Sequence, residues 1–106
     1  MKVNVKSDQE ICSIALEGDM TIYTAMQCKN DMLAPLQECR AIDVDLSGVY
    51  EIDTSGLQIL ALFLKETDIR NIRVRFSAVS ESVREFLNFC GLGNVLGTPE
   101  DSAPCH

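Results

Sequence analysis

The chain has 106 residues, of which 46% are hydrophobic, and it has six aromatic residues and no tryptophan. This length predicts one domain with an aliphatic core. The net charge of −7 disfavours nucleic acids and anionic membrane surfaces as partners, because both attract clustered lysine and arginine. No apolar run approaches the ~20 residues of a transmembrane helix, and residues 1–10 lack the apolar region of a signal peptide. We therefore expect a cytoplasmic protein without membrane insertion.

The cysteines show no spacing typical of a metal site. They are Cys12, Cys28, Cys39, Cys90 and Cys105. No two form a Cys-x-x-Cys pair, and the single histidine, His106, lies in a proline-containing segment, residues 98–106, that we expect to be a flexible C-terminal tail. We expect no metal, no cofactor and five free thiols in a reducing compartment, with Cys12, Cys28 and Cys90 buried as small apolar side chains.

The first half of the chain has the pattern of a β-hairpin followed by a helix. Apolar and polar residues alternate over residues 3–5 and 11–16, which predicts two strands joined by a polar turn. Thr21 is expected to cap the helix that follows. The apolar positions of that helix are Ile22, Ala25, Met26, Leu33 and Leu36. Pro35 should kink or end the helix near residue 34.

The second half continues with alternating strands and helices. Residues 42–46 and 72–76 predict two further strands, and residues 54–67 predict a largely buried helix. A last helix begins at Ser80 and stops at Gly91. Its inward positions are expected to be Val83, Phe86, Leu87 and Cys90. This order implies an α/β fold with an N-terminal hairpin and a mostly parallel sheet of four or five strands, joined by right-handed crossovers.

The third and fourth predicted strands are apolar on one face and charged on the other. Asp43 and Asp45 occupy the charged face of one strand, and Arg73 and Arg75 that of the other. If the strands are neighbours, these charges can lie opposite one another, although the alternative is that each is simply solvated. A parallel sheet covered on both faces is apolar throughout, so here helices should cover mainly one face. This argues against a doubly wound nucleotide-binding fold.

The segment Ile52-Asp53-Thr54-Ser55-Gly56-Leu57 joins the third strand to the buried helix. Asp53 suits a helix N-cap, which places the Thr54 hydroxyl at the positive end of the helix dipole. Gly56 has no side chain and lets another backbone come close. A plain structural cap would explain the motif, but the loop follows the carboxyl end of a parallel strand, where open α/β sheets place functional loops.

Three segments of the chain resemble one family. Asp53-Thr54-Ser55-Gly56-Leu57 is similar to the Asp-(Ser/Thr)-Ser-Gly-Leu signature of STAS-domain anti-sigma-factor antagonists. Leu16-Glu17-Gly18-Asp19-Met20 resembles the segment that leads into the family's first helix, and Phe89-Cys90-Gly91-Leu92 the segment that closes its third. The segments stand in family order and together span residues 3–96. The resemblance implies a STAS-like fold over residues 1–97.

The resemblance also implies a protein-binding switch. In this family a serine kinase that acts as an anti-sigma factor binds the unphosphorylated antagonist and phosphorylates the hydroxyl after the aspartate, and a serine/threonine phosphatase reverses this. Here that hydroxyl belongs to Thr54, which is favoured over Ser55. The implied partner-binding residues are Asp53, Thr54, Ser55, Gly56, Asp19, Thr21 and Tyr23. We expect a monomer or weak dimer with a protein partner and no nucleic acid.

Two features leave the pathway open. The loop before the first helix has Thr21 near where the family commonly carries an acidic residue, and the family's Asp-Thr proteins include STAS subunits of ABC-type lipid transporters that bind the ATPase. Other STAS proteins belong to chemotaxis systems. An enzyme is disfavoured, because the body of the chain has no histidine and an aspartate carboxylate such as that of Asp53 is too weak a base to activate a hydroxyl.

Overall fold

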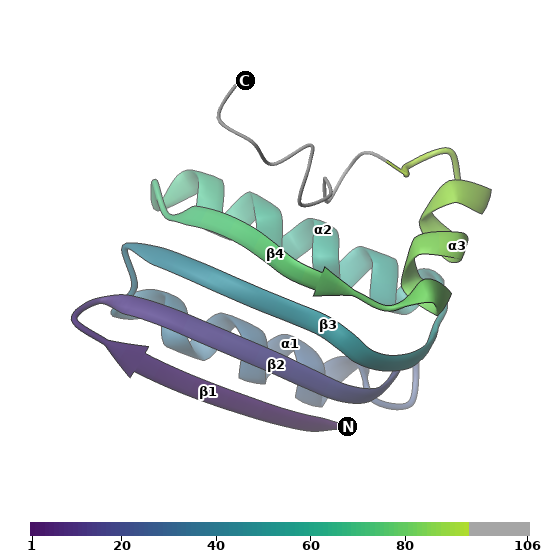
Figure 1. Cartoon of the computed structure of the whole chain (residues 1–106), viewed down its shortest axis with the longest axis horizontal. Coiled ribbons are helices and arrows are strands. Elements are labelled where there is room, and N and C mark those ends of the chain that lie inside the picture. The colour runs from purple at the N-terminus through teal and green to yellow at the C-terminus, as the bar shows by residue number, and fades with distance from the viewer. Residues whose placement is uncertain (94–106) are drawn as a thin grey trace.

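The computed structural model describes residues 1–93. The elements in chain order are β1 (Lys2–Asp8), β2 (Ile11–Met20), α1 (Ala25–Leu33), the short 3₁₀ helix η1 (Ala34–Gln37), β3 (Ala41–Ile52), α2 (Thr54–Ile69), β4 (Arg73–Val79) and α3 (Glu81–Phe89). The strands form a sheet in the order β1-β2-β3-β4 (Figure 1). The predicted hairpin is confirmed: β1 and β2 are antiparallel, and the β2–β3 and β3–β4 pairs are parallel.

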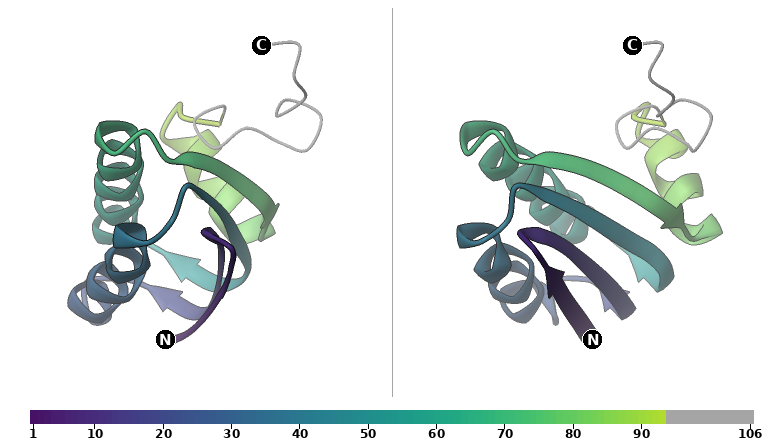
Figure 2. Two further views of the ribbon diagram at one scale, coloured as in Figure 1. Left: turned by 90° about the vertical axis from the view of Figure 1, so that its left-hand side faces the viewer. Right: turned by 60° about the vertical axis from the view of Figure 1, so that its left-hand side comes forward.

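The helices cover mainly one face of the sheet, as expected. Figure 2 shows α1 and α2 side by side on the same side of the strands. The strand residues that face them are buried, and they alternate with residues that are more exposed. The buried set includes Cys12, Ile14, Leu16, Ile42, Val44 and Leu46. α3 lies beyond the carboxyl end of β4 and packs against β3 through a helix face that includes Val83 and Leu87 (Figure 1).

α1 begins later than the sequence predicted. Thr24 stands at its N-cap, and Thr21, the expected cap, lies in the preceding turn with only 8% of its surface exposed. The buried face of α1 is formed by Cys28 and Met32, four residues apart, and Leu36 of η1 follows them. Ile22 and Met26, two of the apolar positions of the predicted helix, are exposed. The predicted break at Pro35 is confirmed: α1 ends at Leu33 and Pro35 lies at the start of η1.

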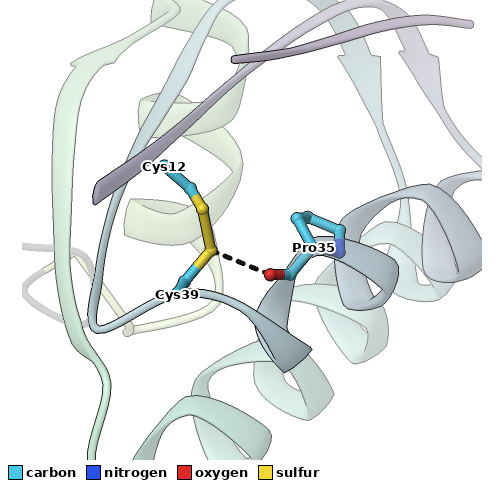
Figure 3. The surroundings of a disulfide bond; sticks show 3 residues. All are labelled: Cys12, Pro35 and Cys39. Atoms are coloured by element: carbon cyan, nitrogen blue, oxygen red, sulfur yellow. Dashed lines mark hydrogen bonds between the residues drawn. A yellow bond between two sulfur atoms is a disulfide. The ribbon is translucent and has the colours of Figure 1, made fainter. Parts of the chain in front are cut away.

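The expectation of five free cysteines is wrong. Cys12, in β2, and Cys39, just before β3, form a disulfide across 27 residues of sequence (Figure 3). In the chain-entropy account, a ring of this length stabilises the folded state by about 3 to 4 kcal/mol relative to the reduced chain. Spacing alone could not pair these residues, because only the fold brings β2 beside the segment that enters β3.

Cys28 and Cys90 are the free cysteines among residues 1–93. Cys28 is buried, as expected. The prediction for Cys90 is wrong: it is exposed, because α3 ends at Phe89 and the chain leaves the helix through Gly91 at φ +75°. Cys105 and the predicted tail over residues 98–106, with its boundary at residue 97, lie outside the described residues.

The charged strand residues occupy the helix-free face, as predicted. Asp43 and Asp45 are half-buried, and Arg73 and Arg75 are exposed. The cross-strand pairing holds for one pair only, Asp43 with Arg75. A register shift after Val44 places Asp45 opposite Ala78, and Arg73 lies opposite Ala41. Within residues 1–93, no ion pair forms among these four charges, and the Asp45 carboxylate instead accepts hydrogen bonds from the backbone N–H and hydroxyl of Ser47.

Candidate functional site

The loops that follow β2 and β3 leave the sheet side by side. Met20, the last residue of β2, is the register partner of Ile52, the last residue of β3. The backbone N–H of Asp53 donates to the Met20 carbonyl oxygen at 3.2 Å, which continues the pairing one residue beyond the strands. The loop at residues 19–24, which contains the candidates Asp19, Thr21 and Tyr23, and the candidate residues 53–56 are therefore brought together at the carboxyl edge of the parallel strands.

Asp53 joins these two segments through its carboxylate. One oxygen, Oδ1, accepts from the backbone N–H groups of Ser55 at 2.8 Å and Gly56 at 3.2 Å, which caps α2 as predicted. The other oxygen, Oδ2, accepts from the backbone N–H of Ile22 at 3.2 Å. A single side chain thus fixes both the start of α2 and the loop that leads to α1. We call these hydrogen bonds the Asp53 clasp.

Gly56 allows the close approach that the sequence predicted. A Cβ at this position would overlap the Met20 carbonyl oxygen and lie 2.9 Å from Cγ1 of Ile52. Gly56 is buried and belongs to the first turn of α2. The absent side chain therefore lets the end of β2 contact the first turn of α2 directly, which is the contact that holds the two loops at a fixed separation.

The loop before α1 is ordered by Thr24, a residue that the sequence interpretation did not single out. The Thr24 hydroxyl donates to the Asp19 carbonyl oxygen at 2.6 Å and accepts from the Thr21 backbone N–H at 3.1 Å. The Thr24 backbone N–H also donates to the Thr21 carbonyl oxygen at 3.0 Å. Threonine hydroxyls often stabilise turns in this way. The sequence feature that could have pointed to this turn is the hydroxyl of Thr24, three residues after Thr21.

The predicted site residues differ in how much of each is available to a partner. Thr54 and Asp19 are exposed, and Tyr23 is 94% exposed. Ser55 is half-buried, and Gly56 and Thr21 are buried, so these three act mainly as support. Asp19 is also the register partner of Glu51 on β3, and this pair of exposed acidic residues lies beside the two loops.

Two apolar residues of the segment around the start of α1 also belong to this surface. Ile22 is 66% exposed and Met26 is 71% exposed. A hollow of about 250 Å³ begins at Ser55 and runs between α1 and α2, and its lining residues are Ala25, Met26, Lys29, Ser55, Gln58, Ile59 and Leu62. In the sequence, Cys28, Met32 and Leu36 recur at intervals of four residues. This spacing could have predicted that they form the buried face of the helix and that Ile22 and Met26 do not belong to it.

The arrangement has the features of a protein-binding surface. It presents an exposed hydroxyl at a helix N-terminus, exposed apolar side chains and a groove between two helices. Comparison with known families identifies the chain, because the model of the STAS domain matches residues 2–103. The chain belongs to the STAS domain family.

Several solved structures share the fold of this STAS domain. An anti-sigma factor antagonist from Mycobacterium paratuberculosis matches with a TM-score of 0.78 and 19% identity, over 92% of this chain and 83% of that one. The unphosphorylated anti-sigma factor antagonist SpoIIAA matches at 0.73 with 18% identity, over 92% and 87% of the chains. The phosphorylated form of the Bacillus protein SpoIIAA matches at 0.69 with 17% identity, over 92% and 90%.

A transporter-related protein is also similar. A sulfate transporter family protein from Wolinella succinogenes matches with a TM-score of 0.69 and 20% identity, over 85% of this STAS domain and 74% of that chain. At these identities the likenesses establish the fold. In the part of the chain that the structure describes, no helix has both the length and the apolar character needed to cross a membrane.

Proposed function

We propose that this STAS domain is a cytoplasmic anti-sigma-factor antagonist, a protein-binding switch controlled by phosphorylation of Thr54. The observation that carries the proposal is the position of Thr54: an exposed hydroxyl at the first residue of α2, directly beside the Asp53 clasp. The proposed partners are a serine kinase that acts as an anti-sigma factor and a serine/threonine phosphatase. The likeness to SpoIIAA, solved in unphosphorylated and phosphorylated forms, supports the proposal.

Thr54 is favoured over Ser55 by accessibility. Within residues 1–93 the Thr54 side chain makes no hydrogen bond, and the residue is exposed. Ser55 is half-buried, its backbone N–H is bound by Asp53, and it faces the groove between α1 and α2. A kinase must bring the hydroxyl in line with the γ-phosphate of ATP, so the exposed side chain is the better acceptor.

A phosphate at Thr54 should change binding and leave the fold intact. The N-terminus of α2 tolerates an anion, because its free N–H groups and dipole favour negative charge. The surface around it is already acidic, with Asp19 and Glu51 paired across the strands beside it. A phosphate adds about −1.5 to −2 charges there. In a closely packed contact with a partner these charges cost several kcal/mol unless they are matched, so binding should be lost.

The proposal is tested by mapping the phosphate and measuring affinity for the kinase that co-purifies with the protein. With this kinase and ATP, wild type should gain one phosphate on Thr54, Thr54→Ala should gain none, and the matched control Ser55→Ala should behave as wild type. Thr54→Glu should weaken binding at least tenfold, about 1.4 kcal/mol, with an unchanged melting temperature. A phosphate on Ser55, or full affinity of Thr54→Glu, would contradict the proposal.

A second candidate is a STAS regulatory subunit of a transporter, of the ABC-type lipid class, which would bind its ATPase through the same loop. The observation that favours it is the likeness to the sulfate transporter family protein. A STAS component of a chemotaxis-type system is a further alternative. Co-purification separates the three, because it recovers a kinase and phosphatase in the first case, an ATPase or permease in the second, and chemotaxis components in the third.

A further inference from the structure

The Cys12–Cys39 disulfide closes a ring that contains half of the candidate site. Cys12 lies near the start of β2, and Cys39 follows η1. The ring between them comprises the rest of β2, the loop at residues 19–24, α1 and η1. The Asp53 clasp holds this ring at the carboxyl edge of the sheet through Ile22, and the disulfide holds it at the opposite edge. α1 is thus tied down at both ends.

Other contacts hold the chain on either side of this unit. The Arg40 backbone N–H donates to the Glu10 carbonyl oxygen at 2.8 Å, and the Arg73 N–H donates to the Arg40 carbonyl oxygen at 3.1 Å. The strand that begins after Cys39 therefore stays in place without the disulfide. α1 itself is anchored by the buried side chains of Cys28 and Met32. Loss of the bridge should release the C-terminal end of the α1–η1 unit and leave the sheet intact.

The surroundings of the bridge also fit the reduced state. Sγ of Cys39 lies 2.8 Å from the carbonyl oxygen of Pro35 in η1 (Figure 3). In the disulfide this sulfur carries no hydrogen, so the contact becomes a hydrogen bond only when Cys39 is a thiol. An acceptor for the reduced thiol is therefore already in place. Cys39 is 9% exposed and Cys12 is 1% exposed, so Cys39 is the sulfur that an external thiolate reaches more readily.

We propose that Cys12–Cys39 is a reversible redox site whose state sets how firmly α1, and the loop before it, is held. A thiolate of an external dithiol attacks Sγ of Cys39, forming a mixed disulfide, and the Cys39–Cys12 bond breaks with its electron pair going to Cys12. The second thiolate of the dithiol then attacks the mixed disulfide and releases Cys39 as a thiolate. The dithiol is oxidised to a disulfide, and Cys12 and Cys39 take up two electrons and two protons.

The consequence for partner binding rests on the proposed function, but the conformational effect does not. α1 starts directly after the loop at residues 19–24, and the Cys28 backbone N–H donates to the Thr24 carbonyl oxygen at 2.9 Å. When α1 opens, the loop loses this bond to Cys28 and keeps the Thr24 hydrogen bonds to Asp19 and Thr21 and the bond from Ile22 to Asp53. Met26, which lies on α1, then loses its fixed position relative to Thr54, whereas Ile22 stays bound to Asp53.

The test compares hydrogen exchange of α1 and α2 in the bridged and reduced protein. Oxidised protein should show three free thiols of five in denaturant, and reduction should add two thiols and two mass units. Exchange in α1 relative to α2 should rise at least tenfold on reduction. Because lowered global stability speeds exchange in both helices, the ratio isolates local opening of α1. The double variant Cys12→Ala, Cys39→Ala should match the reduced protein without reductant, and Cys90→Ala should respond as wild type.

Two outcomes would overturn the proposal. Five free thiols after equilibration with a disulfide oxidant mean that the bridge does not form. A bridge whose reduction leaves the α1 to α2 exchange ratio unchanged is a static structural link. Neither outcome bears on phosphorylation of Thr54, so failure here is distinguishable from failure of the proposed function. Partner affinity measured in both redox states then reports whether the opening of α1 reaches the site.

Discussion

The carboxylate of Asp53 accepts a hydrogen bond from the backbone N–H of Ile22, a residue 31 positions earlier in the chain, at 3.2 Å. The same carboxylate caps α2. The signature aspartate therefore does two things: it starts the helix that carries Thr54, and it holds the loop that supplies the neighbouring exposed side chains. The Asp53 side chain therefore adds to the Met20–Asp53 backbone bond and the Gly56 contact in holding the two segments together.

Replacement of Asp53 should separate these two roles. Asp53→Ala removes the cap and the clasp and should lower the free energy of unfolding by about 1 to 2 kcal/mol. Asp53→Asn keeps one acceptor oxygen for the cap, but its NH₂ group faces the Ile22 N–H and cannot accept from it. This variant should therefore lower the free energy of unfolding by less than Asp53→Ala does and should still loosen the loop. Urea unfolding measures the free energy of unfolding of each variant, and hydrogen exchange at the Ile22 N–H measures how firmly the loop is held. Equal exchange at Ile22 in Asp53→Asn and wild type would contradict the clasp.

Gly56 should not tolerate even a methyl group. In Gly56→Ala the new Cβ overlaps the Met20 carbonyl oxygen and approaches Ile52, so we expect a loss of about 1 to 3 kcal/mol in the free energy of unfolding. This loss would come in spite of a helix propensity that favours alanine by about 1 kcal/mol. Gln58→Ala, at an exposed position one half-turn later, is the matched control and should change stability by less than about 0.5 kcal/mol. A Gly56→Ala variant as stable as wild type would rule out the close contact.

The charges on the helix-free face should interact only weakly. Asp43 and Arg75 are register partners, yet they form no ion pair, and Arg75 is exposed. A double-mutant cycle with alanine at both positions, followed by urea unfolding, should return a coupling of about 0 to 1 kcal/mol. Asp45 and Arg73, which are not register partners, provide the control cycle and should show no coupling. A coupling above about 2 kcal/mol for Asp43 and Arg75 would require a direct ion pair.

Cys28 should resist thiol reagents and make the fold sensitive to alkali. Burial, with a smaller contribution from the nearby Asp31 carboxylate, raises the pKa of Cys28 to about 11. The unfolded chain loses this proton near its ordinary pKa, while the folded protein keeps it. The unfolded state therefore binds fewer protons above pH 9, and stability should fall as the pH rises from about 9 to 11. Cys28→Ala should flatten this part of the stability curve.

The same pKa predicts the labelling pattern of the thiols. At pH 8 the exposed Cys90 should react quickly with iodoacetamide, and Cys28 should react only as the protein unfolds. Peptide mapping after short exposure distinguishes the two. Labelling of Cys28 at the rate of Cys90 would show that the interior around α1 is open under native conditions.

Local patterns in the sequence determined most of the architecture. The alternation at Ile42, Val44 and Leu46 depends on the two-residue period of a strand, and Asp53 caps its helix through bonds to residues two and three positions away. Such signals lie within a few residues, so they can be read without knowing the fold. The hairpin, the parallel order of the later strands and the position of Thr54 at a helix start all followed from them.

Tertiary structure decided what depends on residues far apart in the chain. The disulfide joins Cys12 to Cys39 only because β2 pairs with β3, and a register shift after Val44 separates Asp45 from the arginines. Ile22 is exposed in the turn before α1, and Met26 lies within α1 but away from the helix face that Cys28 and Met32 bury. These contacts are selected by packing and by the length of the intervening chain, and neither is encoded in the spacing of apolar residues along a single element.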